Sequence, residues 1–349
     1  MKAEVVAMDA EHLNMEAIQK AGKILREGGL VAFPTETVYG LGGNALDPKA
    51  SMKIYAAKGR PSDNPLIVHI ADIKDLAKIT TEIPEGARIL AEKYWPGPLT
   101  MILPKADSVP KETTGGLDSV AVRFPSDPIA QELILAAGGY VAAPSANTSG
   151  RPSPTTAGHV AEDLGEAIDM IIDGGQVNIG LESTIVDFTE DIPVVLRPGY
   201  ISLEMLRETL GDVRMDKGLI KPDSKVHPKA PGMKYRHYAP KGQLTLVEGD
   251  RDKVIARINE LVKEKEVEGH KVGVIGTDET LDSYHADILR SIGSRQKPET
   301  VAANLYRILR EFDDLECDYM YSESFFEQGL GNAIMNRMLK AAGYHLITL

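Results

Sequence analysis

Hydrophobic positions in the first 210 residues follow two periods, that of a helix and that of a buried strand. Met15, Ile18, Ala21 and Leu25 have helical spacing, and the glycines after them predict the end of a helix over 14–27. Short apolar runs predict strands at 30–33, 66–70, 99–103, 120–124, 140–142, 170–173, 184–188 and 194–196. Amphipathic stretches predict helices over 48–57, 84–94 and 127–137. So many short strands predict an α/β domain other than a simple doubly wound sheet.

The periodicity is lost between 211 and 242 and then returns. Prolines at 222, 228, 231 and 240 interrupt this stretch, which is a linker by composition with unusual aromatic and basic content. Beyond it, strands are predicted at 244–248, 272–275 and 319–321, and helices at 252–265, 301–312 and 331–342. Such alternation predicts a small three-layer α/β domain. The expected organisation is a first domain over 1–210, a linker over 211–242 and a second domain over 243–349.

Length and composition indicate a soluble protein of two domains. The chain has 349 residues, 43% hydrophobic and 26% charged, and no apolar run approaches the roughly 20 residues that cross a bilayer. The single cysteine, Cys317, excludes an intrachain disulfide and favours a cytoplasmic location, and we interpret it as a small buried hydrophobe. The net charge of −12 repels nucleic acid at long range but permits a small anion held by a few cations.

The segment 143–154, APSANTSGRPSP, has the composition of an anion-binding loop. Small hydroxyl residues and Gly150 let backbone N–H groups approach a ligand closely, and Arg151 adds a positive charge. An ordinary polar turn has a similar composition, so the segment alone does not decide between the two.

Cations and hydroxyl groups recur where other predicted strands begin or end, which is where open α/β sheets bind ligands. They are Lys58, Arg60, Asn64, His69, Arg123, Glu182, Ser183, Thr184 and Arg197. Donors outnumber carboxylates in this set. That balance favours phosphoryl or nucleotidyl transfer, in which fixed donors meet charge on phosphate oxygens, and it points to attack by a group that is already anionic.

Other catalytic motifs are absent or weak. The sequence has no Walker-type GxxxxGK[ST] loop, no GxSxG elbow and no HxxxH pair. The glycines of 40–43 match a loose dinucleotide pattern, but a long polar turn separates them from the preceding strand, whereas that fingerprint needs strand, turn and helix in succession. A nicotinamide enzyme is therefore a weak alternative.

Eight segments in combination resemble the threonylcarbamoyl-AMP synthase family. They are PTETVYGLG at 34–42, KGRP at 58–61, NPLIVH at 64–69, WPGPLT at 95–100, VAVRFP at 120–125, SAN at 145–147, ESTIVD at 182–187 and RPG at 197–199. The linker sequence PGMKYRHYAP at 231–240, followed by a further α/β domain, is similar to the long two-domain form. The resemblance implies a YrdC-like first domain with a twisted mixed sheet and a Rossmann-like second domain.

The resemblance also implies a nucleotidyltransferase that joins L-threonine, bicarbonate and ATP into threonylcarbamoyl-adenylate and releases pyrophosphate. ATP is then a substrate, and Mg²⁺ is expected to accompany it without ligands from the protein. A separate tRNA threonylcarbamoyl transferase would receive the product, so direct tRNA binding is expected to be weak or absent, and no membrane is involved.

Particular residues take roles by the same resemblance. Lys58 and Arg60 are the catalytic candidates and would neutralise the carboxylate or carbamate. Five residues would surround L-threonine, namely Thr37, His69, Arg123, Ser183 and the backbone of Ala143. Eight would hold ATP, namely Arg60, Asn64, Ser119, Ser145, Asn147, Ser153, Arg197 and Tyr235, the last from a linker that acts as a lid. An RNA-binding or ribosome-associated module is the alternative from another class, and the negative net charge speaks against it.

Overall fold

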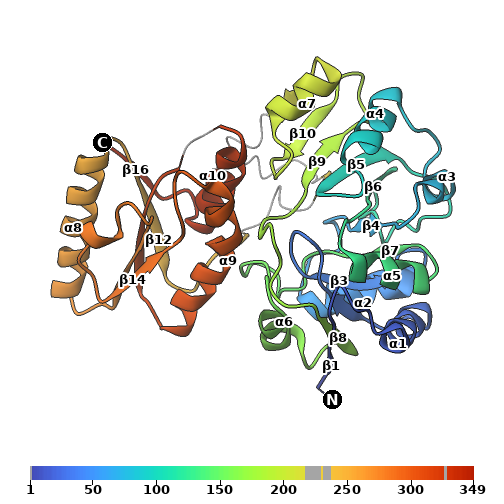
Figure 1. Ribbon diagram of the computed structural model, residues 1–349, viewed down its shortest axis with the longest axis horizontal. Helices are drawn as coiled ribbons and strands as arrows, with labels where there is room; N and C mark the ends of the chain where they lie inside the picture. The colour runs from blue at the N-terminus through green and yellow to red at the C-terminus, as the bar shows by residue number, and fades with distance from the viewer. Residues whose placement is uncertain (1, 217–228, 231–236, 326–327) are drawn as a thin grey trace. The chain divides into compact units, whose positions relative to one another are not determined.

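The computed structural model describes residues 2–216, 229–230, 237–325 and 328–349, which fall into two compact units (Figure 1). Unit 1 comprises Met1–Ser149, Ser153–Asn178 and Glu182–Tyr235, and unit 2 comprises Gly150–Pro152, Ile179–Leu181 and Arg236–Leu349. Most of the predicted linker, including Tyr235 and the proposed lid, lies outside the described residues.

Unit 1 is built on a mixed sheet, as predicted. Its strands are β1 (Glu4–Ala7), β2 (Val31–Phe33), β3 (Gly40–Asn44), β4 (Ile67–His69), β5 (Leu99–Pro104), β6 (Ser119–Arg123), β7 (Val141–Ala142), β8 (Met170–Asp173), β9 (Thr184–Asp187), β10 (Val194–Arg197) and β11 (Arg214–Met215). Among the described residues their order is β1-β8-β2-β3-β7-β4-β6-β5-β9-β10-β11. Neighbours such as β4 and β6 run parallel, while β4 and β7 run antiparallel.

Helices cover both faces of this sheet. They are α1 (Met15–Arg26), α2 (Pro48–Lys58), α3 (Leu76–Ile79), α4 (Glu85–Tyr94), α5 (Pro128–Ala136), α6 (Ala157–Leu164) and α7 (Leu203–Leu210). On one face, α1 and α5 bury residues such as Ile18 and Leu133 against β2 and β8. On the other, α2, α4 and α7 contribute Ile54, Leu90 and Leu206 to the larger core. His69 is paired with Val141, which packs in the core beneath α1 and α5, so the polar residues described below project from this same face of the sheet.

The glycine-rich segment 40–44 forms strand β3, which corrects the polar turn that its composition suggested. Glycine is required here for packing, because a Cβ on Gly43 would lie 3.0 Å from the Ile54 side chain. Helix α2 starts only at Pro48, with Asp47 as its predicted N-cap. The segment therefore lacks the tight turn from strand to helix that a dinucleotide site needs.

Unit 2 is the predicted three-layer α/β domain. Its strands, β12 (Gln243–Glu248), β13 (Val272–Gly276), β14 (Ile288–Ser291), β15 (Tyr319–Glu323) and β16 (Leu346–Thr348), lie in the order β14-β13-β15-β12-β16. All four neighbouring pairs are parallel. Helix α8 (Arg251–Val267) covers one face, and α9 (Pro298–Asp314) and α10 (Leu330–Ala341) cover the other (Figure 1). Cys317 is buried as expected, and burial raises the pKa of its thiol to about 11.

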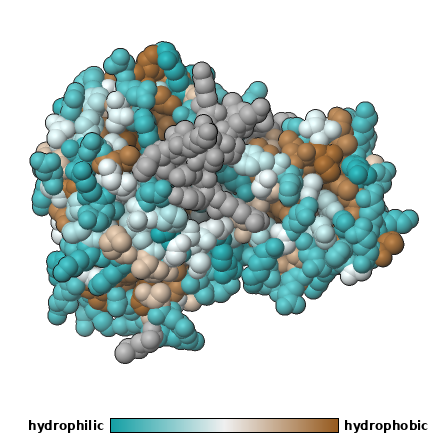
Figure 2. All heavy atoms as spheres, turned by 180° about the vertical axis from the view of Figure 1, so that it is seen from behind, coloured by the Kyte–Doolittle hydropathy of each residue, from teal (hydrophilic) through white to brown (hydrophobic). Residues whose placement is uncertain are grey.

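The surface seen from behind is mostly hydrophilic, with hydrophobic residues in small separate groups (Figure 2). Among the described residues, no helix combines the length and the apolarity that a bilayer crossing requires.

Candidate functional site

A row of side chains crosses the open part of the unit 1 sheet. The strand register pairs His69 of β4 with Arg123 of β6, and Arg123 with Thr100 of β5. Thr100 is paired in turn with Ile185 of β9, which is opposite Arg197 of β10. Because paired residues project from the same face, these side chains lie together although they come from five strands.

Ser183 joins this row to Arg197. The Ser183 hydroxyl lies 2.7 Å from that of Thr100, and Arg197 donates to the Ser183 carbonyl at 2.9 Å and to its hydroxyl at 3.1 Å. All three side chains are buried. Next to them, the Ser153 hydroxyl donates to the carboxylate of Glu182, the residue before Ser183. The segment 143–154, called the serine-rich loop below, therefore reaches the same place. The structure therefore brings Ser183 and Arg197 into contact, with Ser153 at the adjacent Glu182 and Arg123 beside Thr100 in the strand register.

His69 and Arg123 are neighbours in the row. Burial and, to a smaller extent, the positive charge of Arg123 lower the pKa of His69 to about 3, so the imidazole is neutral at physiological pH. Arg123 is buried as well and donates from Nη1 to the Thr37 hydroxyl at 2.9 Å. The row thus offers two fixed cations, Arg123 and Arg197, together with neutral hydrogen-bonding groups, and His69 does not titrate near pH 7.

We expect the His69→Gln variant to lose less stability than the wild type as the pH falls. The folded-state pKa of His69 lies below its ordinary value, so between about pH 6.5 and 3 the unfolded chain binds more protons and the wild type loses stability as pH falls. Glutamine does not titrate. Chemical denaturation of both proteins between pH 4 and 7 should show the difference in unfolding free energy moving in favour of the variant as pH falls. A constant difference would mean that His69 does not carry this effect.

A second group of polar residues lies beside the serine-rich loop. Lys58 is the last residue of α2, is only 2% exposed, and donates from Nζ to the backbone carbonyls of Ser145, at 2.5 Å, and Asn147. The Ser145 hydroxyl donates to the Asn147 side chain at 2.6 Å. Lys58 therefore fixes the loop through its backbone, in addition to any charge that it presents to a ligand.

Arg60 follows Lys58 after a reversal of the chain at Gly59, which ends α2 in the left-handed region with φ 61°. Its guanidinium donates to the carbonyls of Asn64 at 3.3 Å and Pro65 at 3.0 Å, just before β4. The Asn64 side chain is 2% exposed, and its Oδ1 accepts no hydrogen bond from the described residues. This end of β4 therefore combines a fixed cation with a buried acceptor.

Ala143, Ser119 and Tyr235 are the remaining predicted residues, and the structure describes the first two of them. Ala143 donates its N–H to the Ile67 carbonyl at 2.9 Å, so a contact with an amino acid would use the Ala143 carbonyl oxygen. Ser119 begins β6, four residues before Arg123, which places it about 13 Å along the strand. Tyr235 lies outside the described residues.

An apolar row runs beside the polar one and is covered by part of the predicted linker. Ile67, Ala121 and Ile102 form it, and Ala230 is fully buried against them. The neighbouring Lys229 forms ion pairs with Asp187 at 3.2 Å and Glu190 at 2.9 Å. Although burial acts to lower it, the pKa of Lys229 is raised by these partners. The chain after 216 is thus fastened to the sheet at 229–230.

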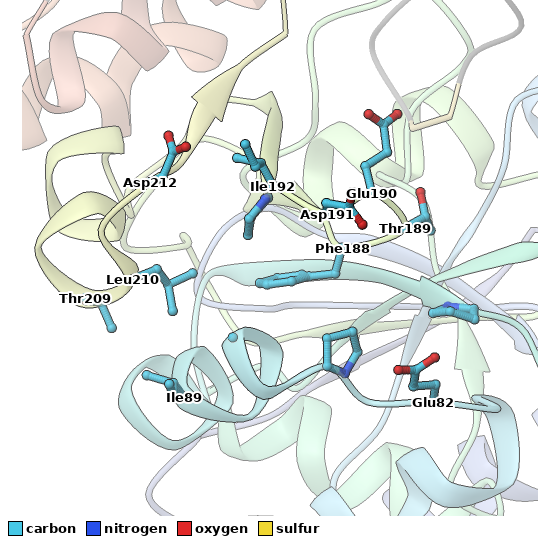
Figure 3. A pocket seen from close by; sticks show the side chains of 14 residues that line it. Glu82, Ile89, Phe188, Thr189, Glu190, Asp191, Ile192, Thr209, Leu210 and Asp212 are labelled. Carbon is cyan, nitrogen blue, oxygen red and sulfur yellow. The ribbon is translucent and has the colours of Figure 1, made fainter.

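A separate hollow of about 630 Å³ lies between α4, α7 and the connection from β9 to β10 (Figure 3). Four carboxylates line it, those of Glu82, Glu190, Asp191 and Asp212, together with apolar groups such as Phe188 and Leu210. None of its lining residues is lysine or arginine. It would repel a phosphate group and contains none of the predicted site residues, so we place the site on the polar row.

Several buried carboxylates were not singled out from the sequence. Glu36 lies 2.8 Å from Arg123, and Asp187 is 1% exposed. Burial and, to a smaller extent, the charge of Glu36 raise the pKa of Asp127, the N-cap of α5, to about 6. The sequence inventory of few carboxylates was therefore incomplete, although Glu36 lay within a quoted motif. Among the described residues, no group of three or more His, Cys, Asp or Glu side chains could hold a metal ion.

Comparisons with known proteins agree across nearly the whole chain. Residues 23–199 match the Sua5/YciO/YrdC family model, described as telomere recombination, and residues 201–343 match the model for the threonylcarbamoyl-AMP synthase C-terminal domain. The threonylcarbamoyl-AMP synthase of Pyrococcus abyssi is 51% identical over 97% of both chains, and that of Bacillus subtilis is 50% identical over 96% of this chain and 95% of its own. A crystal structure of P. abyssi Sua5 complexed with L-threonine has a TM-score of 0.94 at 50% identity and covers 99% of each chain.

Proposed function

Because the chain belongs to the threonylcarbamoyl-AMP synthase family, which consists of nucleotidyltransferases, we propose that it joins L-threonine, bicarbonate and ATP into threonylcarbamoyl-adenylate and releases pyrophosphate. The observation that carries this proposal is the row from His69 to Arg197, in which two cations, a hydroxyl and a neutral imidazole from four strands share one face. The crystal structure of the P. abyssi relative with L-threonine supports the amino acid as the ligand.

The reaction needs little acid or base chemistry from the protein. The ammonium form of threonine and bicarbonate give a carbamate, one water and one released proton. The carbamate oxygen then attacks the α-phosphate, and pyrophosphate leaves. Since the nucleophile is already an anion, fixed donors that stabilise charge on the phosphate oxygens suffice. Carbamates lose CO₂ in water, so the reacting groups must be shielded from solvent.

The described residues divide between two parts of this site. We assign Thr37, His69, Arg123, Ser183 and the carbonyl of Ala143 to L-threonine, because they lie on or beside the polar row. Seven residues are assigned to ATP, namely Arg60, Asn64, Ser119, Ser145, Asn147, Ser153 and Arg197. Lys58 or Arg60 would neutralise the carbamate or the triphosphate, with Mg²⁺ accompanying the ATP. Tyr235 is assigned to ATP on the family resemblance alone.

The product would pass to a tRNA threonylcarbamoyl transferase, in keeping with the family name. The net charge of −12 does not favour a direct, tight complex of this chain with tRNA.

Pyrophosphate release with and without L-threonine tests the proposal. With ATP and bicarbonate present, we expect release to depend on L-threonine. L-Serine, which lacks one methyl group, should support a kcat/KM about 10- to 200-fold lower. Release at the same rate without any amino acid would overturn the assignment, and so would a requirement for NAD or NADP.

A further inference from the structure

Glu36 is a buried carboxylate with unused hydrogen-bonding capacity. It lies in the connection from β2 to β3, between Thr35 and Thr37, whose hydroxyls are 2.9 Å apart. Its side chain is only 10% exposed. Both carboxylate oxygens are buried, and neither accepts a hydrogen bond from any of the described residues. A carboxylate in this state is costly to bury, so its placement needs a reason.

Arg123 partly supplies that reason. Its Nη2 lies 2.8 Å from Glu36 Oε1, but the approach lacks the alignment of a hydrogen bond. Nη1 donates to Thr37, whereas Nε and Nη2 donate to none of the described residues. The pair is therefore neutral as a whole, yet keeps free acceptors on Glu36 and free donors on Arg123.

The ligand that satisfies both groups carries both charges. A phosphate would suit Arg123 but would meet the Glu36 carboxylate beside it. A simple cation would suit Glu36 but would meet Arg123. A zwitterionic amino acid offers an ammonium with three donors and a carboxylate with acceptors, and the neighbouring His69 and Thr37 add no net charge.

We propose that Glu36 binds the α-ammonium group of the amino acid substrate, while Arg123 faces its carboxylate or hydroxyl oxygen. The identity of the amino acid as L-threonine rests on the proposed function. The contact survives the first chemical step, because the nitrogen of a carbamate keeps one hydrogen that Glu36 can accept. Glu36 thereby selects α-amino acids over hydroxy acids that carry the same carboxylate.

Glu36→Gln separates this role from a positioning role toward Arg123. The variant keeps the size of the side chain and removes its charge. Calorimetric titration of the full chain would use L-threonine, threoninol, which lacks the carboxylate, and 3-hydroxybutyrate, which lacks the amine. We expect the variant to bind L-threonine and threoninol about 10- to 100-fold more weakly than the wild type and 3-hydroxybutyrate equally well. The proposal would be overturned if the variant bound all three ligands more weakly by the same factor, or if its affinity for L-threonine were unchanged.

Two controls keep the outcome readable. Glu11→Gln changes an exposed glutamate away from the site and should leave all three affinities unchanged. The wild type alone gives a test that does not depend on the folding of a variant, because it should bind L-threonine at least about 10-fold more tightly than 3-hydroxybutyrate. Equal affinities would refute the role of Glu36. If the wild type binds no L-threonine at all, the proposed function itself fails.

Discussion

Replacing Arg60 with alanine is expected to lower pyrophosphate release by about 100- to 1,000-fold at saturating ATP and L-threonine. The guanidinium is held in place by the carbonyls of Asn64 and Pro65, just before β4. A cation fixed in advance stabilises charge that develops on phosphate oxygens without reorganising during the reaction. The fold should survive, because Arg60 is partly exposed and the hydrogen bonds described above join it to backbone carbonyls at one turn. Initial rates would measure pyrophosphate release, and thermal melting would show whether the fold is intact.

Arg88→Ala is the matched control for this prediction. Arg88 also donates to a backbone carbonyl, that of Ile83 at 3.2 Å, but it is exposed and lies at the start of α4 away from the polar row. It should keep wild-type turnover. Near wild-type turnover in Arg60→Ala would remove Arg60 from the site. A loss of turnover in the Arg197→Ala variant is harder to interpret, because Arg197 also holds Ser183 in place.

The elements that the sequence predicted share one property, namely burial of a regular apolar stripe or run. Helix α1 and strands such as β5 have it throughout. The missed strands β1, β11, β14 and β16 are all at the edge of a sheet. An edge strand is paired on one side only and is partly exposed, so its sequence lacks the continuous apolar run of a central strand. Strand β3 was missed for another reason, since its glycines are needed for close packing and resemble a turn.

The composition of the site was more predictable than its arrangement. Cations such as Arg123 and Arg197 were identifiable because each ends an apolar run. Their meeting depends on the pairing of β5 with β9, which are distant in the sequence. The role of Glu36 depends on its burial. The sequence does not show whether a single glutamate is buried or exposed to solvent. Only the register of the folded sheet places it against Arg123.

Lys58→Met is expected to lower pyrophosphate release by at least about 100-fold and to destabilise the protein as well. Methionine matches the length of the side chain but donates no hydrogen bond. The buried carbonyls of Ser145 and Asn147 would then each lose a donor, at a cost of about 1–3 kcal/mol for each group that stays unsatisfied. The loop that carries Ser145, Asn147 and Ser153 would lose its fixed position. Initial rates and the urea midpoint would measure the two effects.

Lys53→Met provides the comparison on the same helix. Lys53 donates from Nζ to the Gly28 carbonyl at 2.6 Å, outside the polar row, so this variant removes a similar hydrogen bond without touching the serine-rich loop. A small loss of stability with normal turnover is expected for Lys53→Met. If Lys58→Met likewise kept normal turnover at a temperature where it is folded, the loop would not need Lys58, and the lysine would be structural only. If KM for ATP rose while kcat held, Lys58 would stabilise bound ATP and the transition state equally and so would not act on the chemical step.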